Sequence, residues 1–186
     1  MNEWLPTSLP ARVDSGGLTF IPLTPALVEP DYAAVMRDIP LLRAWSGQDW
    51  PTETFAIEED LDDLIRHDLE QTERIALAYS VLIDGTVQGC IYVRPLLAAL
   101  RTRNLDAGGL SVDARDAVVR GWLHDRPAVD LIGACMSWLR SEPFAFPRLW
   151  WQTNTHCPDQ LEACDALGLD EVLRIEGDDR IWEMRA

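Results

Sequence analysis

The chain has 186 residues, of which 47% are hydrophobic, so it can bury a core and is too apolar to be a disordered segment. Its 16 basic residues stand against 31 acidic ones, and the net charge of −15 argues against a broad nucleic-acid-binding surface. All 16 basic residues are arginine, which excludes a lysine Schiff base.

The first predicted elements are an arm, a strand and a helix. Residues 1–17 are interpreted as a flexible N-terminal arm, and residues 18–186 as a single domain. The segment LTFIPL (18–23) alternates like a strand. Thr24 followed by Pro25 is typical of a helix start, and we expect Pro30 to interrupt or kink that helix.

The clearest helical pattern covers residues 54–76. Leu61, Leu64, Ile65 and Leu69 recur at spacings of three and four, which predicts that they share one apolar face. The acidic run at 58–63 suits the positive end of the helix dipole, so we interpret it as a solvated helix start, with a metal or amine site as the alternative. His67 on this helix is expected to be partly exposed.

A hairpin is predicted next, because two strand-like segments (76–83 and 86–95) flank the turn dipeptide Asp84-Gly85. Residues 96–113 then form a long connection, interpreted as a short helix and a glycine-rich loop. Arg101 and Arg103 in this connection could reach an anionic ligand, although solvated arginines are the simpler interpretation.

The remaining segments predict a strand at 116–124, a helix after Pro127, a strand at 148–154, a helix at 158–169 and a closing pair of strands. Trp150 and Trp151 alternate, so we expect one in the core and the other toward a cleft or partner. The order of elements predicts an α/β (α+β) fold, with a mixed, mostly antiparallel sheet flanked by helices on both faces.

This order resembles the fold of the GNAT acyltransferases. Three local features carry the resemblance: the hairpin VLIDGTVQGCIYV, the strand that ends at Trp122 and Leu123 before a loop and helix, and the segment RLWWQTNTHCPDQLEACDALGL, with Leu169 in place of a family Phe. The resemblance runs from about Leu18 to the C-terminus.

The resemblance implies transfer of an acetyl group from acetyl-CoA to an amine. In the family, acyl-CoA lies in a V between two central strands, and its pyrophosphate rests on backbone N–H groups at the following helix start. The corresponding cofactor-binding residues here are Trp122, Leu123, Ala128, Val129, Asp130, Leu131, Ile132 and Gly133.

This turn departs from the family pattern of Arg or Gln, two residues, Gly, one residue, then Gly or Ala. Ala128 replaces the Arg or Gln, Leu131 replaces the first Gly, and Asp130 adds a negative charge, so only Gly133 fits. Three interpretations stay open: CoA held through backbone and strand contacts, another acyl carrier or ligand, or a non-catalytic binding or interaction module.

The candidate catalytic residues are His124 and Cys164. Cys164 aligns with the family's proton-donating Tyr, and Cys157 stands where an Asn often lies; a small packed side chain is the alternative for Cys164. His124 at a strand end is the candidate base, with an exposed loop residue as its alternative. His156 neighbours Cys157, but the cysteine spacing predicts no metal site.

The expected partner is a small-molecule amine acceptor, which the net charge of −15 favours as a cation. We expect no nucleic-acid partner. Because no apolar run reaches 18 residues and no early run fits a signal peptide, we also expect no membrane segment and a cytoplasmic location. Unpaired sheet edges suggest a homodimer.

Overall fold

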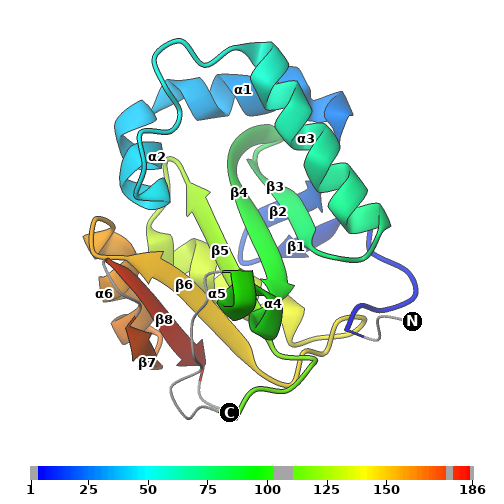
Figure 1. Cartoon of the computed structure of the whole chain (residues 1–186), viewed down its shortest axis with the longest axis vertical. Helices are drawn as coiled ribbons and strands as arrows, with labels where there is room; N and C mark the ends of the chain where they lie inside the picture. The colour runs from blue at the N-terminus through cyan, green and yellow to red at the C-terminus, as the bar shows by residue number, and fades with distance from the viewer. Residues whose placement is uncertain (1–3, 103–110, 175–177, 185–186) are drawn as a thin grey trace.

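The computed structural model describes residues 4–102, 111–174 and 178–184. Its strands form one eight-stranded sheet in the order β1-β2-β3-β4-β5-β6-β8-β7 (Figure 1). The β5–β6 pair is parallel and each other pair is antiparallel, which confirms the predicted mostly antiparallel sheet. The strands are β1 (Val13–Ser15), β2 (Leu18–Pro22), β3 (Leu77–Ile83), β4 (Thr86–Pro95), β5 (Ala117–Leu123), β6 (Leu149–Asn154), β7 (Leu169–Arg174) and β8 (Asp179–Met184).

Helices cover both faces of this sheet, as predicted. The α-helices are α1 (Val28–Arg37), α2 (Ile39–Ser46), α3 (Ile57–Thr72), α4 (Leu96–Thr102), α5 (Ala128–Leu139) and α6 (Pro158–Ala166), and a 3₁₀ turn (Pro25–Leu27) precedes α1. Alternate residues of β5 separate the two layers: Val119 and Leu123 pack with α5, whereas Val118 and Trp122 pack under α1 to α4. Figure 1 shows α1, α2 and α3 grouped at one end of the molecule.

The β4 and β5 strands approach closely because glycines stand at two contact points. A Cβ on Gly89 would lie 2.1 Å from the Trp122 carbonyl oxygen, and a Cβ on Gly121 would lie 2.9 Å from the Cys90 carbonyl oxygen. No larger residue fits either position without moving the backbone. These glycines therefore set the position of β5 at the centre of the sheet.

Residues 4–17 differ from the flexible arm that the sequence suggested. Trp4 and Leu5 are buried in the main core, and the Trp4 indole N–H donates to the Arg74 carbonyl at 2.8 Å. Farther along, β1 pairs with β2. The physical reason is the apolar surface of Trp4 and Leu5, which is removed from water only if the segment folds back.

Two predictions about helices are wrong. Pro30 does not interrupt α1, because it lies in the first helical turn, where a backbone N–H has no partner within the helix. On α3, Leu64 is buried as expected, but Ile65 and Leu69 are 48% and 54% exposed. The buried side of α3 instead carries two polar residues, Asp60 and His67.

Trp150 and Trp151 are both fully buried, so neither faces a cleft or partner as expected for one of them. They pack on opposite faces of β6: Trp151 joins the core under α5, and Trp150 joins the cluster that includes Leu96 and Leu100 of α4. In the described part of the chain, no helix has both the length and the apolar character that crossing a membrane requires.

The polar interior of the α1–α3 layer contains two carboxyl groups. Asp31 on α1 and Asp60 on α3 are buried, and one oxygen of each has no hydrogen-bond partner among the described residues. Burial, and then the nearby charges of Asp60 and Asp63, raise the pKa of Asp31 to about 7. Asp31 therefore favours the folded state most when it is protonated.

We predict that Asp31→Asn raises the melting temperature at pH 8 and raises it much less at pH 5. A carboxyl with a raised pKa holds its proton more tightly in the folded chain, so stability falls as pH rises from about 4 through 7. The shift corresponds to at most about 4 kcal/mol. Thermal melts at both pH values check this, with the exposed Asp62→Asn as the control. A loss of stability at pH 8 would contradict the assignment.

Candidate functional site

The central feature of the sheet is a split between β5 and β6. The two strands pair over three residue pairs, which end at Val119 and Trp151. Beyond this point β5 continues to Leu123 and β6 continues to Asn154 without pairing to each other. Two central, neighbouring strands thus separate in mid-sheet.

The backbone groups of Gly121 and Leu123 point into this split. The His124 N–H bonds to the Gln88 carbonyl, on the β4 side, and the Ala117 N–H bonds to the Arg148 carbonyl, on the β6 side. Because successive residues of a strand direct their backbone groups to opposite neighbours, Gly121 and Leu123 face the same side as Ala117. An extended chain with amide groups can pair with such an exposed strand edge.

Gln160 on α6 bridges the split on the side covered by α5 and α6. Its Nε2 donates to the Gly121 carbonyl oxygen at 2.9 Å, and its Oε1 accepts from the Trp151 indole N–H at 3.1 Å. Gln160 is itself buried. One side-chain amide therefore connects β5 and β6 just beyond their last backbone pair.

The C-terminal end of α2 closes the other side. The Trp45 carbonyl oxygen accepts from the Arg120 Nη2 at 2.5 Å and from the Asn154 Nδ2 at 2.9 Å. Arg120 belongs to β5 and Asn154 to β6, so α2 is attached to both separated strands. Cationic and amide donors suit this position, because the last carbonyl groups of a helix lack internal partners and carry partial negative charge.

A cavity of about 230 Å³ lies at the split, between the ends of α2 and β5 and the starts of α5 and α6. Because Trp122 and Leu123 point to opposite faces of β5 and both line it, the cavity extends through the sheet. Its lining residues are Leu41, Ala44, Trp45, Trp122, Leu123, Ala128, Leu131, His156, Cys157, Asp159 and Gln160.

The N-terminus of α5 borders this cavity and no side chain caps it. The Pro127 carbonyl accepts from the Asp130 N–H at 3.0 Å, and no hydrogen bond to the N–H groups of Ala128 or Val129 occurs among the described residues. Unpaired N–H groups at a helix start attract anions. The Asp130 carboxylate lies 3.5 Å from the Arg126 Nη1, so its charge is partly balanced.

The structure brings half of the predicted cofactor-binding set to the cavity. Trp122, Leu123, Ala128 and Leu131 line it. The other four do not: Ile132 is fully buried in the core, and Val129, Asp130 and Gly133 lie on other sides of the first turns of α5.

His124 does not line this cavity. It is buried, its Nε2–H donates to the Ala34 carbonyl at 3.0 Å, and its ring packs edge-on against Trp122. Burial lowers the pKa of His124, so the ring is neutral at pH 7. This geometry attaches the end of β5 to α1 and does not support the predicted role of general base.

Of the two cysteines on or next to α6, Cys157 lines the cavity and Cys164 is fully buried away from it. Burial, followed by the charge of Asp159, raises the pKa of Cys157 to about 11. Burial raises the pKa of Cys164 to about 12. Both thiols are protonated at neutral pH, and of the two only Cys157 is in contact with the cavity.

Sequence reasoning missed Trp45, Asn154 and Gln160. Their positions carry no motif, because each acts through a contact between segments that are distant in sequence. The nearest signal was the α6 segment itself, in which Gln160 stands in the first turn, two residues after Pro158. No group of three or more His, Cys, Asp or Glu side chains suited to a metal ion occurs within the described ranges.

No protein-family model matches the chain, and no curated protein matches it. Solved structures do resemble it. RimJ of Mycobacterium smegmatis, solved in complex with a CoA-disulfide, aligns with a TM-score of 0.67 and 14% identity over 98% of this chain and 89% of its own. The microcin self-immunity acetyltransferase MccE, in complex with acetyl-CoA and AMP, aligns with a TM-score of 0.66 and 11% identity over 94% and 96%.

A third neighbour, AAC(6')-Ib in complex with paromomycin and acetyl-CoA, aligns with a TM-score of 0.64 and 12% identity over 91% of this chain and 92% of its own. These acetyltransferases each match nearly the whole chain. At 11–14% identity, this likeness shows the fold. The chain has the GNAT acetyltransferase fold.

Proposed function

We propose that the protein is an N-acetyltransferase that transfers an acetyl group from acetyl-CoA to an amine. The observation that carries the proposal is the split beyond Val119 and Trp151, with a cavity of about 230 Å³ that borders the uncapped start of α5. Structural neighbours solved with acetyl-CoA or a CoA-disulfide support it by analogy of fold.

The residues at the split suit acetyl-CoA in chemical terms. The N–H groups of Ala128 and Val129 offer donors to phosphate oxygens, and these contacts need no particular side chain, so the departure of this turn from the family pattern does not remove them. The Gly121 N–H and the backbone groups of Leu123 offer partners to the amides of an extended arm, whereas the Gly121 carbonyl already accepts from Gln160.

In the proposed reaction the neutral amine nitrogen attacks the thioester carbonyl carbon. A C–N bond forms, the C–S bond breaks, and one proton leaves the amine while one proton reaches the thiol sulfur, so the reaction needs no oxidant or reductant. We assign the second proton transfer to Cys157, because its thiol lines the cavity and is protonated at neutral pH. His156 lies at the same cavity but is exposed and bonded to Asp178 at 3.0 Å.

A second candidate function is a ligand-binding or protein-interaction module without catalysis. The bridge made by Gln160 favours it, because this side chain already occupies the Gly121 carbonyl and holds the split together. Binding of acetyl-CoA without turnover of any amine would support this alternative. Turnover would exclude it.

We predict that acetyl-CoA at about 100 times its dissociation constant stabilises the chain by about 2.7 kcal/mol. For a chain of this size the melting temperature should rise by roughly 5–10 °C. A thermal melt with and without acetyl-CoA measures this, with free adenosine as the control for the nucleoside part. An unchanged melting temperature at millimolar acetyl-CoA would contradict the proposed function.

Asp130→Asn should tighten acetyl-CoA binding about 2- to 5-fold. The substitution removes a negative charge from the first turn of α5 and releases Arg126 from its ion pair, and exposed pairs of this kind contribute at most about 1 kcal/mol. Isothermal titration calorimetry at low salt measures the change, with Asp165→Asn near the C-terminal end of α6 as the control. Equal tightening in both variants would show that only net charge matters.

Gln160→Met should also tighten acetyl-CoA binding, by about 5-fold, while lowering the melting temperature of the free chain. The variant keeps the side-chain length but frees the Gly121 carbonyl, and one hydrogen bond contributes about 1 kcal/mol net. Calorimetry and thermal melts measure the two effects. Unchanged affinity would mean that the bound arm does not use this carbonyl.

A further inference from the structure

A second cavity, of about 450 Å³, lies on the α1–α4 face of the sheet, beneath α2 and α3. The aromatic, arginine and histidine side chains that line it include residues of four elements: Trp45 (α2), Arg66 and His67 (α3), Tyr92 and Arg94 (β4), and Arg120 (β5). Its lining is more polar than that of the core, yet it includes several flat aromatic rings. This second cavity is distinct from the one at the split where acetyl-CoA is proposed to bind.

The charge of this cavity is opposite to that of the chain. Arg66, Arg94 and Arg120 line it together with one carboxylate, Asp63, although acidic residues outnumber basic ones 31 to 16 in the sequence. His67 adds no charge, because burial, and then the nearby Arg66, lower its pKa to about 4. The cavity thus concentrates guanidinium groups on a strongly acidic protein.

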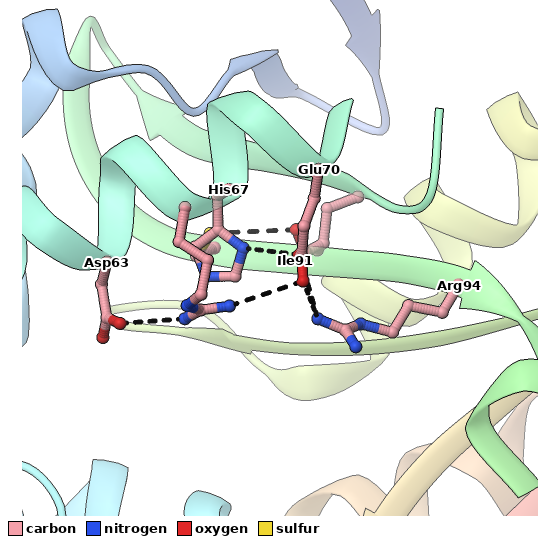
Figure 2. Close-up of polar contacts among 7 residues, drawn as sticks. Asp63, His67, Glu70, Ile91 and Arg94 are labelled. Carbon is pink, nitrogen blue, oxygen red and sulfur yellow. Dashed lines mark hydrogen bonds and ion pairs between the residues drawn. The ribbon is translucent and has the colours of Figure 1, made fainter. Parts of the chain in front are cut away.

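Acidic side chains of α3 hold two of these guanidinium groups in place, as Figure 2 shows for Asp63, Glu70 and Arg94. Glu70 accepts from the Arg94 Nη2 with both carboxylate oxygens at 3.0 Å, and Asp63 accepts from the Arg66 Nη2 at 2.9 Å. The Nε and Nη1 groups of Arg94 have no hydrogen-bond partner in the part of the chain that the structure describes. Fixed guanidinium groups with remaining donors are suited to carboxylate or phosphate.

Aromatic rings supply the apolar side of the cavity. Trp45 stacks with Tyr92 at 5.7 Å and packs against Trp50 at 6.5 Å between ring centroids. The Arg120 guanidinium lies 4.3 Å from the Trp45 ring centroid. The cavity therefore presents flat apolar surface next to positive charge.

This cavity also lies next to the split. Trp45 lines both cavities, and Arg120 of β5 and Gln152 of β6 are the first residues beyond the last paired residues, Val119 and Trp151. A molecule held beneath α2 and α3 can therefore extend to the point where the strands separate.

We propose that this cavity binds the acceptor, and that the acceptor is an amine that also carries an anionic group, a carboxylate or a phosphate. Arg66 and Arg94 bind the anion, and Trp45, Trp50 and Tyr92 contact the apolar part. The inference rests on the proposed acetyltransferase function. It replaces the cationic acceptor expected from net charge, because three guanidinium groups and only one carboxylate, Asp63, line this cavity.

The test compares acceptors that differ only in the anion. L-phenylalanine is paired with L-phenylalaninamide, O-phosphoethanolamine is paired with ethanolamine, and spermidine represents the cations. Acetyl transfer is followed by release of the CoA thiol. We expect kcat/KM to be at least ~10-fold higher for the anionic member of one pair, as charged hydrogen bonds imply, and the pair that shows it identifies carboxylate or phosphate.

Arg94→Gln and Arg66→Gln should each remove most of this preference, whereas Arg12→Gln, an exposed arginine before β1, should keep it. Melting temperatures of all three variants separate loss of folding from loss of recognition. Equal use of both members in both pairs, or faster transfer to spermidine than to either anionic amine, would overturn the proposal and leave the acetyltransferase function standing.

Calorimetry without acetyl-CoA distinguishes failure of the proposed acetyltransferase function from failure of the proposed site for anionic amines. If acetyl-CoA neither binds nor reacts, the proposed function fails, and amine binding alone decides the present inference. At least ~10-fold tighter binding of one anionic amine than of its uncharged partner, lost in Arg94→Gln, supports a site for anionic amines. Equal affinities within both pairs overturn it.

Discussion

The early end of pairing between β5 and β6 is the constraint on which the site depends. Three backbone pairs hold the strands together, and then both continue apart toward Leu123 and Asn154. Separated strands inside a sheet leave backbone groups that need partners, since unpaired buried amides are costly. Gln160 satisfies one of these groups, the Gly121 carbonyl, and the side chains of Arg120 and Asn154 tie the two separated strands to the Trp45 carbonyl of α2, so polar side chains stabilise the opening instead of closing it.

Two glycines on the β4 side of β5 hold this strand in place while it separates from β6. Gly89 and Gly121 let β4 and β5 approach more closely than any side chain would allow, so β5 stays attached to β4 where it leaves β6. The strand can therefore end in a free edge and still direct the chain into α5. The position of the uncapped helix start relative to the cavity follows from this attachment.

Local sequence patterns predicted much of the fold and little of the site. The β3–β4 hairpin, β5, α5 and α6 were predictable because turn dipeptides and apolar periodicity depend on neighbours in sequence. The end of β5 and the start of α5 were likewise located, and four of the eight binding positions proposed there line the cavity. Helix α3 was found, but its buried side was assigned wrongly, since His67 is buried by packing on Tyr92 and Ile65 is not. Gln160, Trp45 and Arg94 gain their roles from contacts across the fold, which no spacing in the sequence encodes.

Trp45 lines both cavities, so a substitution at this position changes both of them at once. A smaller residue there would widen the space for a ligand but would also remove the indole ring on which the Arg120 guanidinium of β5 packs. Mutational routes to altered ligand preference are therefore constrained at Trp45. They are open along α3 and β4, where Arg66 and Arg94 lie in the second cavity alone.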